Sequence, residues 1–179
     1  MRKALFLLGM LSDSDIDWLI AAGNRERVSR GTVLIHEGKP FGAIYFVLDG
    51  TLGVSVATLG GREIAQLKCG EIVGEMSFVD SRPPSATVKA LEDSVVLSVP
   101  RARMIAKLEE VEFAARFYRA LSVFLADRLR NTIYQFGEAK VELSEKDFEG
   151  SDQLDPGVLE KVAMAGARFD WLMRRLRGE

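Results

Sequence analysis

One stretch of the sequence combines residue types that can hold an anion. Residues 74–80 lack the alternation of a strand and lead into the proline-containing segment 81–84, so we expect one helical turn and a loop inserted between two strands. A short helix offers unpaired backbone N–H groups and a positive dipole end to a negative charge. Gly74, at the start of the turn, lets the backbone approach a ligand closely. This pattern predicts an anion cradle that begins at Gly74.

Catalytic and metal chemistry have few residues to use in this chain. The sequence contains one histidine, His36, and one cysteine, Cys69. An internal disulfide needs two cysteines, a structural zinc site usually takes four Cys or His ligands, and a Ser-His-Asp triad would have to use His36. A small β-barrel metalloenzyme is disfavoured because such sites draw on several histidines. We therefore expect no catalytic residues, no metal, no resident cofactor and no enzymatic activity.

Composition limits the class of protein further. The chain has 179 residues, enough for one domain with some additions, and 47% of them are hydrophobic. It carries 24 Lys and Arg against 26 Asp and Glu, a net charge of −2, whereas a dedicated nucleic-acid binder usually has a basic surplus. No apolar run is long enough for a membrane span, and the apolar start resembles a signal peptide for only a few residues. We expect a cytoplasmic protein whose N-terminal segment is buried.

The elements that must position the cradle change in character along the chain. Residues 12–22 are expected to form a helix, with Ser12 as N-cap and Asp15 three residues later, close to a capping box. From about 28 to 100, short β-branched runs alternate with Asp-Gly and Gly-Gly turns, which is typical of an antiparallel sandwich, roll or barrel. No β-α-β rhythm is present, so a parallel sheet is not expected.

Helical periodicity returns after Pro100. Apolar residues recur at three- and four-residue steps from Phe113 to Ile133, which predicts a long helix over about 111–136. Such a helix spans roughly 37 Å and would extend past a small roll, so part of its apolar stripe is expected to pair with a second chain as a homodimer. Residues 138–155 are mostly acidic and indicate a solvated linker. Pro156 then begins a final helix over 156–179.

Two stretches together resemble the cyclic nucleotide-binding domain family, the module of bacterial catabolite activator proteins, protein kinase A regulatory subunits and nucleotide-gated channels. Residues 31–50 match the early glycine framework of that family, and residues 73–90 match its phosphate-binding cassette, with a Gly-Glu opening and a Ser-Ala-Thr-Val closing. The resemblance covers roughly 12–136. It implies an α+β fold, an antiparallel β roll of the double-stranded β-helix type, within a domain over 1–137.

The resemblance also implies roles for individual residues. Glu75 would accept a hydrogen bond from the ribose 2′-hydroxyl, and Gly74 and Met76 flank it in the cassette. Ser85 and Ala86 would offer N–H or hydroxyl groups to the phosphate, and the hydroxyl groups near Ser85 and Thr87 lie where the family sometimes reads guanine. The implied ligand is cAMP or cGMP. Glu75 has a simpler alternative role as a charge at the start of a short helix.

The sequence departs from the family at the arginine that neutralises the cyclic phosphate. Counted from Glu75 without gaps, that position holds Pro84, which has neither charge nor backbone N–H. A hydrogen bond to a charged group contributes about 1.5–3 kcal/mol, so its loss should weaken binding roughly ten- to a hundredfold. Arg82, two residues upstream, is a candidate replacement; its simpler interpretation is a solvated loop charge.

Several functions are consistent with these features. The sequence favours a regulatory module in which ligand binding at the cassette repositions the long helix and a protein partner, in transport or signalling, reads the change. The alternative is a ligand-independent scaffold or dimerisation module, which Pro84 supports. A DNA-binding regulator would need a helix-turn-helix domain after the long helix, and only the acidic linker and one helix follow it.

Overall fold

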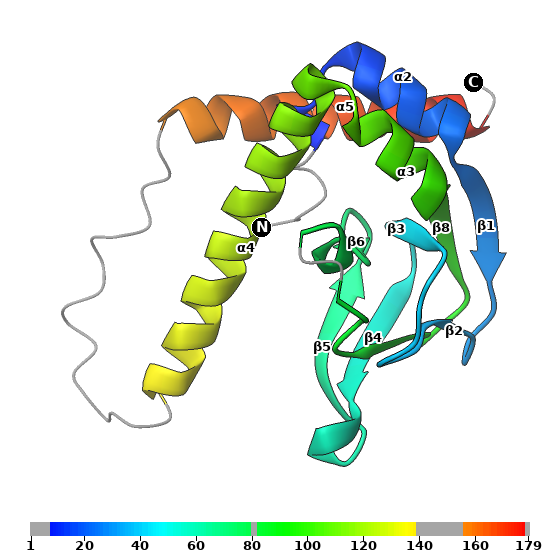
Figure 1. Cartoon of the computed structure of the whole chain (residues 1–179), viewed down its shortest axis with the longest axis vertical. Coiled ribbons are helices and arrows are strands. Elements are labelled where there is room, and N and C mark those ends of the chain that lie inside the picture. The colour runs from blue at the N-terminus through cyan, green and yellow to red at the C-terminus, as the bar shows by residue number, and fades with distance from the viewer. Residues whose placement is uncertain (1–7, 80–81, 139–155, 178–179) are drawn as a thin grey trace.

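The computed structural model describes residues 8–79, 82–138 and 156–177, and its centre is a roll of two antiparallel sheets (Figure 1). Both sheets have four strands, in the orders β1-β8-β3-β6 and β2-β7-β4-β5. The expected fold class, an α+β antiparallel roll, is confirmed. The strands are β1 (Asn24–Val28), β2 (Val33–Ile35), β3 (Ala43–Asp49), β4 (Thr51–Val56), β5 (Arg62–Lys68), β6 (Ile72–Val73), β7 (Thr87–Ala90) and β8 (Ser94–Pro100).

The first strand begins earlier than the sequence pattern indicated. The β pattern was expected from about residue 28, whereas β1 already pairs with β8 from Asn24 onward. Four of the five residues of β1 are exposed and only Val28 is buried. Because nearly all of its side chains are exposed, this strand has no alternation of apolar and polar residues that could reveal it in the sequence. Backbone pairing with β8 holds it in the sheet.

Helix α2 (Asp13–Ala22) begins at the expected capping box. The Ser12 Oγ accepts a hydrogen bond from the Asp15 backbone N–H at 3.3 Å, and the Asp15 carboxylate accepts one from the Ser12 N–H at 2.8 Å. This arrangement satisfies two N–H groups that a helix start leaves without intrahelical partners. Because both contacts span only three residues, the local sequence was sufficient to predict them.

Three further helices lie against the roll. Helix α3 (Arg101–Leu108) follows β8 directly, and α4 (Val111–Glu138) is the expected long helix. In Figure 1, α2, α3 and the final helix α5 (Pro156–Arg177) lie along one end of the roll, while α4 runs away from that end beside the sheets. The buried side chains of Phe113, Phe117 and Leu121 attach the first half of α4 to the core shared with α2 and the sheet β1-β8-β3-β6.

The final helix, α5 (Pro156–Arg177), folds back onto the N-terminal helices. Arg168 makes several of the polar contacts: its Nε donates to the Asp13 carboxylate at 2.9 Å, and its Nη1 donates to the backbone carbonyls of Leu8, Gly9 and Leu11. On the next turn, Leu172 is completely buried. The acidic segment expected as a linker falls, apart from Glu138, outside the described residues.

Each helix in the described part of the chain is too short or too polar to serve as a membrane-spanning segment.

Candidate functional site

The predicted cradle lies between β6 and β7, and Gly74 is essential to its shape. Gly74 has φ +90°, a backbone conformation that disfavours every residue with a Cβ. A Cβ on Gly74 would also lie 2.7 Å from the Phe41 ring and 3.2 Å from the Ala43 carbonyl oxygen. The short helix that follows, η2 (Met76–Phe78), is a single 3₁₀ turn that begins after Glu75. The expected helical turn is therefore present as a shorter and tighter element.

A cavity of about 260 Å³ opens beside this turn, just below the usual range for small-molecule sites, about 300–1,000 Å³. Six of the seven predicted site residues line it: Gly74, Glu75, Met76, Arg82, Ser85 and Ala86. The seventh, Thr87, does not. The fold therefore brings the two ends of the cassette together around one space.

Thr87 is directed into the roll's own hydrogen bonding. Its hydroxyl oxygen accepts a hydrogen bond from the Glu37 N–H at 3.1 Å. Side chains alternate along a strand, and it is the neighbouring residues Ala86 and Val88 that line the cavity. Contact of Thr87 with a ligand remains a prediction, and the structure gives its hydroxyl a structural partner.

Glu75 is a carboxylic acid buried at the edge of this cavity. Only 3% of its surface is exposed, and a carboxylate is buried this deeply only with polar partners. The residues around the cavity opposite Glu75 are largely apolar, with Ile35, Val54 and Leu67 contributed by strands β2, β4 and β5. A carboxylate in such surroundings can accept hydrogen bonds from ligand hydroxyl groups at high strength, because little water competes for them.

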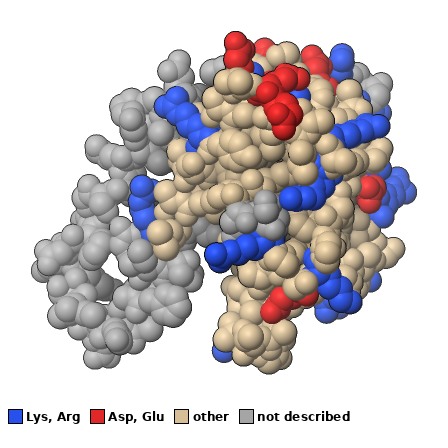
Figure 2. Space-filling model, viewed as in Figure 1, with Lys and Arg blue, Asp and Glu red and all other residues tan. Residues whose placement is uncertain are grey.

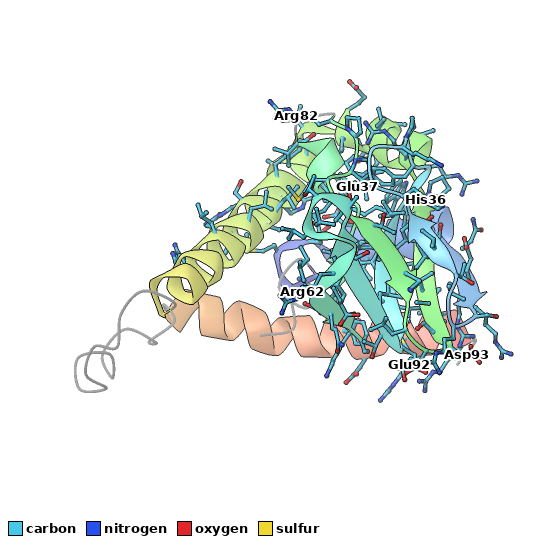
Figure 3. All side chains as sticks on the ribbon, turned by 90° about the horizontal axis from the view of Figure 1, so that it is seen from below. His36, Glu37, Arg62, Arg82, Glu92 and Asp93 are labelled. Atoms are coloured by element: carbon cyan, nitrogen blue, oxygen red, sulfur yellow. The ribbon has the colours of Figure 1, made fainter. Side chains whose placement is uncertain are left out.

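The loop that carries Pro84 is fixed by the backbone. The Pro84 carbonyl accepts a hydrogen bond from the Gly38 N–H at 2.8 Å, which attaches the cassette to the turn after β2. Among the described residues that line the cavity, Arg82 is the one basic side chain. Figure 3 shows Arg82 at the cassette end of the roll, far from Glu92 and Asp93 at the other end. The cavity therefore has an arginine among its lining residues even though Pro84 stands at the family's arginine position.

The cassette also contacts the helices directly. Phe78, the last residue of η2, packs edge-on against Phe117 of α4 with ring centroids 6.5 Å apart, and the Arg101 guanidinium of α3 lies 4.8 Å above its ring. The Tyr118 hydroxyl donates to the Phe78 carbonyl at 3.4 Å. Sequence reasoning placed Phe78 in the cassette but did not connect it to Phe117, because the two residues are distant in sequence.

A second buried carboxylate has a different setting. Asp15 accepts hydrogen bonds from Arg116 of α4 at 2.7 and 3.1 Å. Burial by itself would raise the pKa of Asp15, but the hydrogen bonds from Arg116 and Ser12 outweigh it and lower that pKa below 3.8. The same contact raises the pKa of Arg116. This pair joins α2 to α4, and neither of its residues lines the cassette cavity.

Neither a metal site nor a basic surface competes with the cassette cavity in the part of the molecule that the structure describes and Figure 2 shows. Within the described ranges, His, Cys, Asp and Glu side chains form no group of three that could hold a metal ion. The face shown in Figure 2 carries basic side chains scattered among uncharged and acidic ones. The cassette cavity is therefore the site in the described structure that best matches the predicted chemistry.

The chain is similar to known cyclic nucleotide-binding domains. The sequence model of the cyclic nucleotide-binding domain matches residues 25–110. The cyclic AMP receptor protein of Thermus thermophilus is 31% identical over 141 residues, which cover 78% of this chain and 61% of the relative. The Pycsar effector protein XpPycTIR of Xanthomonas perforans is 30% identical over 112 residues, which cover 62% of this chain and 35% of the relative. The chain thus spans about three fifths and one third of these two relatives.

A solved structure gives a closer match in length. The N-terminal domain of a transcriptional regulator from Streptomyces coelicolor A3(2) superposes with a TM-score of 0.57 at 31% sequence identity. The match covers 71% of this chain and 90% of that domain. The similarity therefore extends over nearly the whole of a separate domain that has been solved alone.

Proposed function

Because the chain belongs to the cyclic nucleotide-binding domain family, we propose that it is a cytoplasmic regulatory module that binds a cyclic nucleotide in the cassette cavity. The observation that carries this proposal is the cavity itself, where buried Glu75 and the backbone at Gly74 face Ser85 and Ala86. In this arrangement Glu75 accepts a hydrogen bond from the ribose hydroxyl, and the cassette N–H groups hold the phosphate.

Arg82 supplies the positive charge that Pro84 cannot. It lies in the cavity wall two residues before Pro84, and the Pro83-Pro84 pair restricts the backbone between them. The Gly38 contact fixes the far end of this stiff segment. A phosphate at the mouth of the cavity would then meet the Arg82 guanidinium instead of an arginine at position 84.

Binding is coupled to the helices through Phe78. A ligand that contacts Gly74, Glu75 and Met76 touches the start of η2. At the end of η2, the Phe78 ring contacts both Phe117 and Arg101. A shift of η2 therefore changes the packing of α3 and α4, which is a differential contact of the kind that shifts a conformational equilibrium. A protein partner, in transport or signalling, reads the new position of α4.

The part of α4 beyond Ala120 is proposed as a dimer contact. Val123 and Leu129 are 39% and 61% exposed on a helix that extends beyond its own core, so they are available to pack against a second copy. We expect sedimentation analysis to show a homodimer that Leu129→Asp converts to monomer. If Leu129→Asp still forms the dimer, the part of α4 beyond Ala120 is not the interface.

Calorimetric titration with cAMP and cGMP tests the ligand. We expect Pro84→Arg to bind about ten- to a hundredfold more tightly than the natural sequence, since it restores a charge-assisted hydrogen bond. Arg82→Ala should weaken binding, and Pro40→Arg, which adds the same charge outside the cavity, should leave it unchanged. If neither the natural protein nor Pro84→Arg binds either nucleotide, the proposal is wrong.

A ligand-independent scaffold is the second candidate, and Pro84 is the residue that favours it. Hydrogen exchange distinguishes the two functions. If cyclic nucleotide changes the exchange of α3 and α4, the module is regulatory; if saturating nucleotide changes no helix, the roll is a fixed support for a partner that binds the helices.

A further inference from the structure

A second cavity lies on the opposite side of the sheet β1-β8-β3-β6, under the last turns of α5. It measures about 580 Å³, which is within the usual range for small-molecule sites. One wall comes from the roll, with Arg25 on β1, Asp49 at the end of β3 and Val95 on β8. The cassette cavity shares none of its lining residues.

Helix α5 forms the other wall with a single face. Phe169, Met173 and Arg177 follow each other at four-residue steps, so they lie on one stripe of the helix, with Asp170 and Arg174 beside them. The neighbouring stripe, with Arg168 and Leu172, is the one that attaches α5 to the N-terminal helices. The Arg168 stripe thus holds the helix on the N-terminal helices, while the next stripe lines the cavity, with Phe169 and Met173 also packed against the core.

The lining has the composition of a site for an anion. Arg25, Arg174 and Arg177 bring guanidinium groups from two different elements, against the carboxylates of Asp49 and Asp170, a net charge of +1. Guanidinium groups are suited to paired hydrogen bonds with carboxylate, phosphate or sulfonate oxygens. Leu48 and Val95 of the sheet and Phe169 and Met173 of α5 add apolar surface.

We propose that this cavity binds a small anion with an apolar portion, held between the roll and α5 by Arg25, Arg174 and Arg177. The anionic group lies among the guanidinium groups, and the apolar portion lies on the surface between the sheet and the helix. Asp49 and Asp170 select ligands that also carry N–H or O–H donors. Because the ligand contacts both walls, its binding stabilises the docked position of α5. This site does not depend on the function of the cassette.

Cys69 gives the cavity a local reporter. It lies in the wall, is partly exposed, and is the single cysteine of the chain. The test uses the full-length reduced protein, the aromatic sulfonate dye ANS as the anionic probe, and neutral dithiodipyridine as the thiol reagent. We expect saturating ANS to slow the reaction of Cys69, and the double variant Arg174→Ala, Arg177→Ala to lower ANS affinity about tenfold and abolish this protection.

The matched control is Arg62→Ala, which removes an exposed arginine at the start of β5. In Figure 1, this part of the β4-β5 hairpin lies at the far end of the roll from α5. The control should bind ANS and protect Cys69 as the natural protein does, and thermal melts should show that all variants are folded. The proposal is overturned if saturating ANS leaves the Cys69 rate unchanged, if the double variant and the control behave alike, or if cAMP displaces the dye completely.

Discussion

Two buried carboxylates in this protein are about equally hidden from solvent, but only one of them lines the cassette cavity. Asp15 in the helical layer is 2% exposed and Glu75 in the roll is 3% exposed. Asp15 belongs to a capping box and an ion pair with Arg116, so its hydrogen-bonding capacity is used within the fold. Glu75 lies at the edge of a cavity whose other walls are mostly apolar. Burial of a charge therefore does not distinguish a structural role from a ligand-binding one, whereas access to a cavity does.

The largest expected effect lies on the structural side of this comparison. Asp15→Ala removes the partner of Arg116 and half of the capping box, so we expect the free energy of unfolding to fall by about 3 kcal/mol. Urea denaturation measures this change. Glu112→Ala is the matched control: Glu112 is 91% exposed and lies 3.9 Å from Arg116 Nη1, so its loss should change stability by less than about 0.5 kcal/mol. Equal losses in both variants would show that the buried pair contributes nothing special.

Gly74→Ala tests the backbone of the cassette, with Gly31→Ala as its control. The two glycines have nearly the same φ, +90° and +89°, but a Cβ at Gly31 meets no atom within 4 Å. We expect Gly31→Ala to cost about 1 kcal/mol of stability through strain alone, and Gly74→Ala to cost about 2 kcal/mol because Phe41 must also move. Only Gly74→Ala should impair nucleotide binding in the same calorimetric assay. A binding defect in Gly31→Ala as well would point to a general loss of folding.

Glu75→Gln should reverse the pattern seen for Asp15. The amide keeps the shape of the side chain and can still hydrogen-bond within the fold, so the loss of stability should be smaller than for Asp15→Ala, while nucleotide affinity should fall roughly ten- to a hundredfold with the loss of a charge-assisted hydrogen bond. Glu92→Gln removes a carboxylate at the far end of the roll and should leave affinity unchanged (Figure 3). If Glu75→Gln unfolds the protein and keeps its affinity when folded, Glu75 is a structural residue like Asp15.

The smallest effect is a difference in pH dependence. Because the pKa of Asp15 is lowered in the folded protein, the stability it contributes is fully present above pH 3.8, its unfolded value, and is lost as pH falls through the lower folded value. The difference in stability between the natural protein and Asp15→Asn should therefore shrink when denaturation is measured at pH 3 rather than pH 5. A difference that grows on acidification would mean that the folded pKa is raised.

Much of the cassette and the start of α2 could be predicted because the sequence signals for both are local. The Gly-Glu opening, the turn at 76–78 and the capping box of α2 each depend on residues within a few positions of one another. Strand β1 was placed too late because its exposed charged side chains carry no alternation. The orientation of Thr87 also escaped prediction, since the bond between its hydroxyl and the Glu37 N–H joins residues fifty positions apart.

By itself, the sequence determined which residues were available: a glycine that tolerates positive φ, an acid after it, an arginine two positions before a proline, and an apolar period that makes a long helix. Only the tertiary structure decided which of these share a space. The cavity walls come from separate strands, Phe78 meets Phe117 across the core, and Arg168 reaches carbonyls more than 150 residues away. The physical reason is that local hydrogen bonding and steric limits act over a few residues, whereas a cavity or a docked helix results from how whole sheets and helices pack.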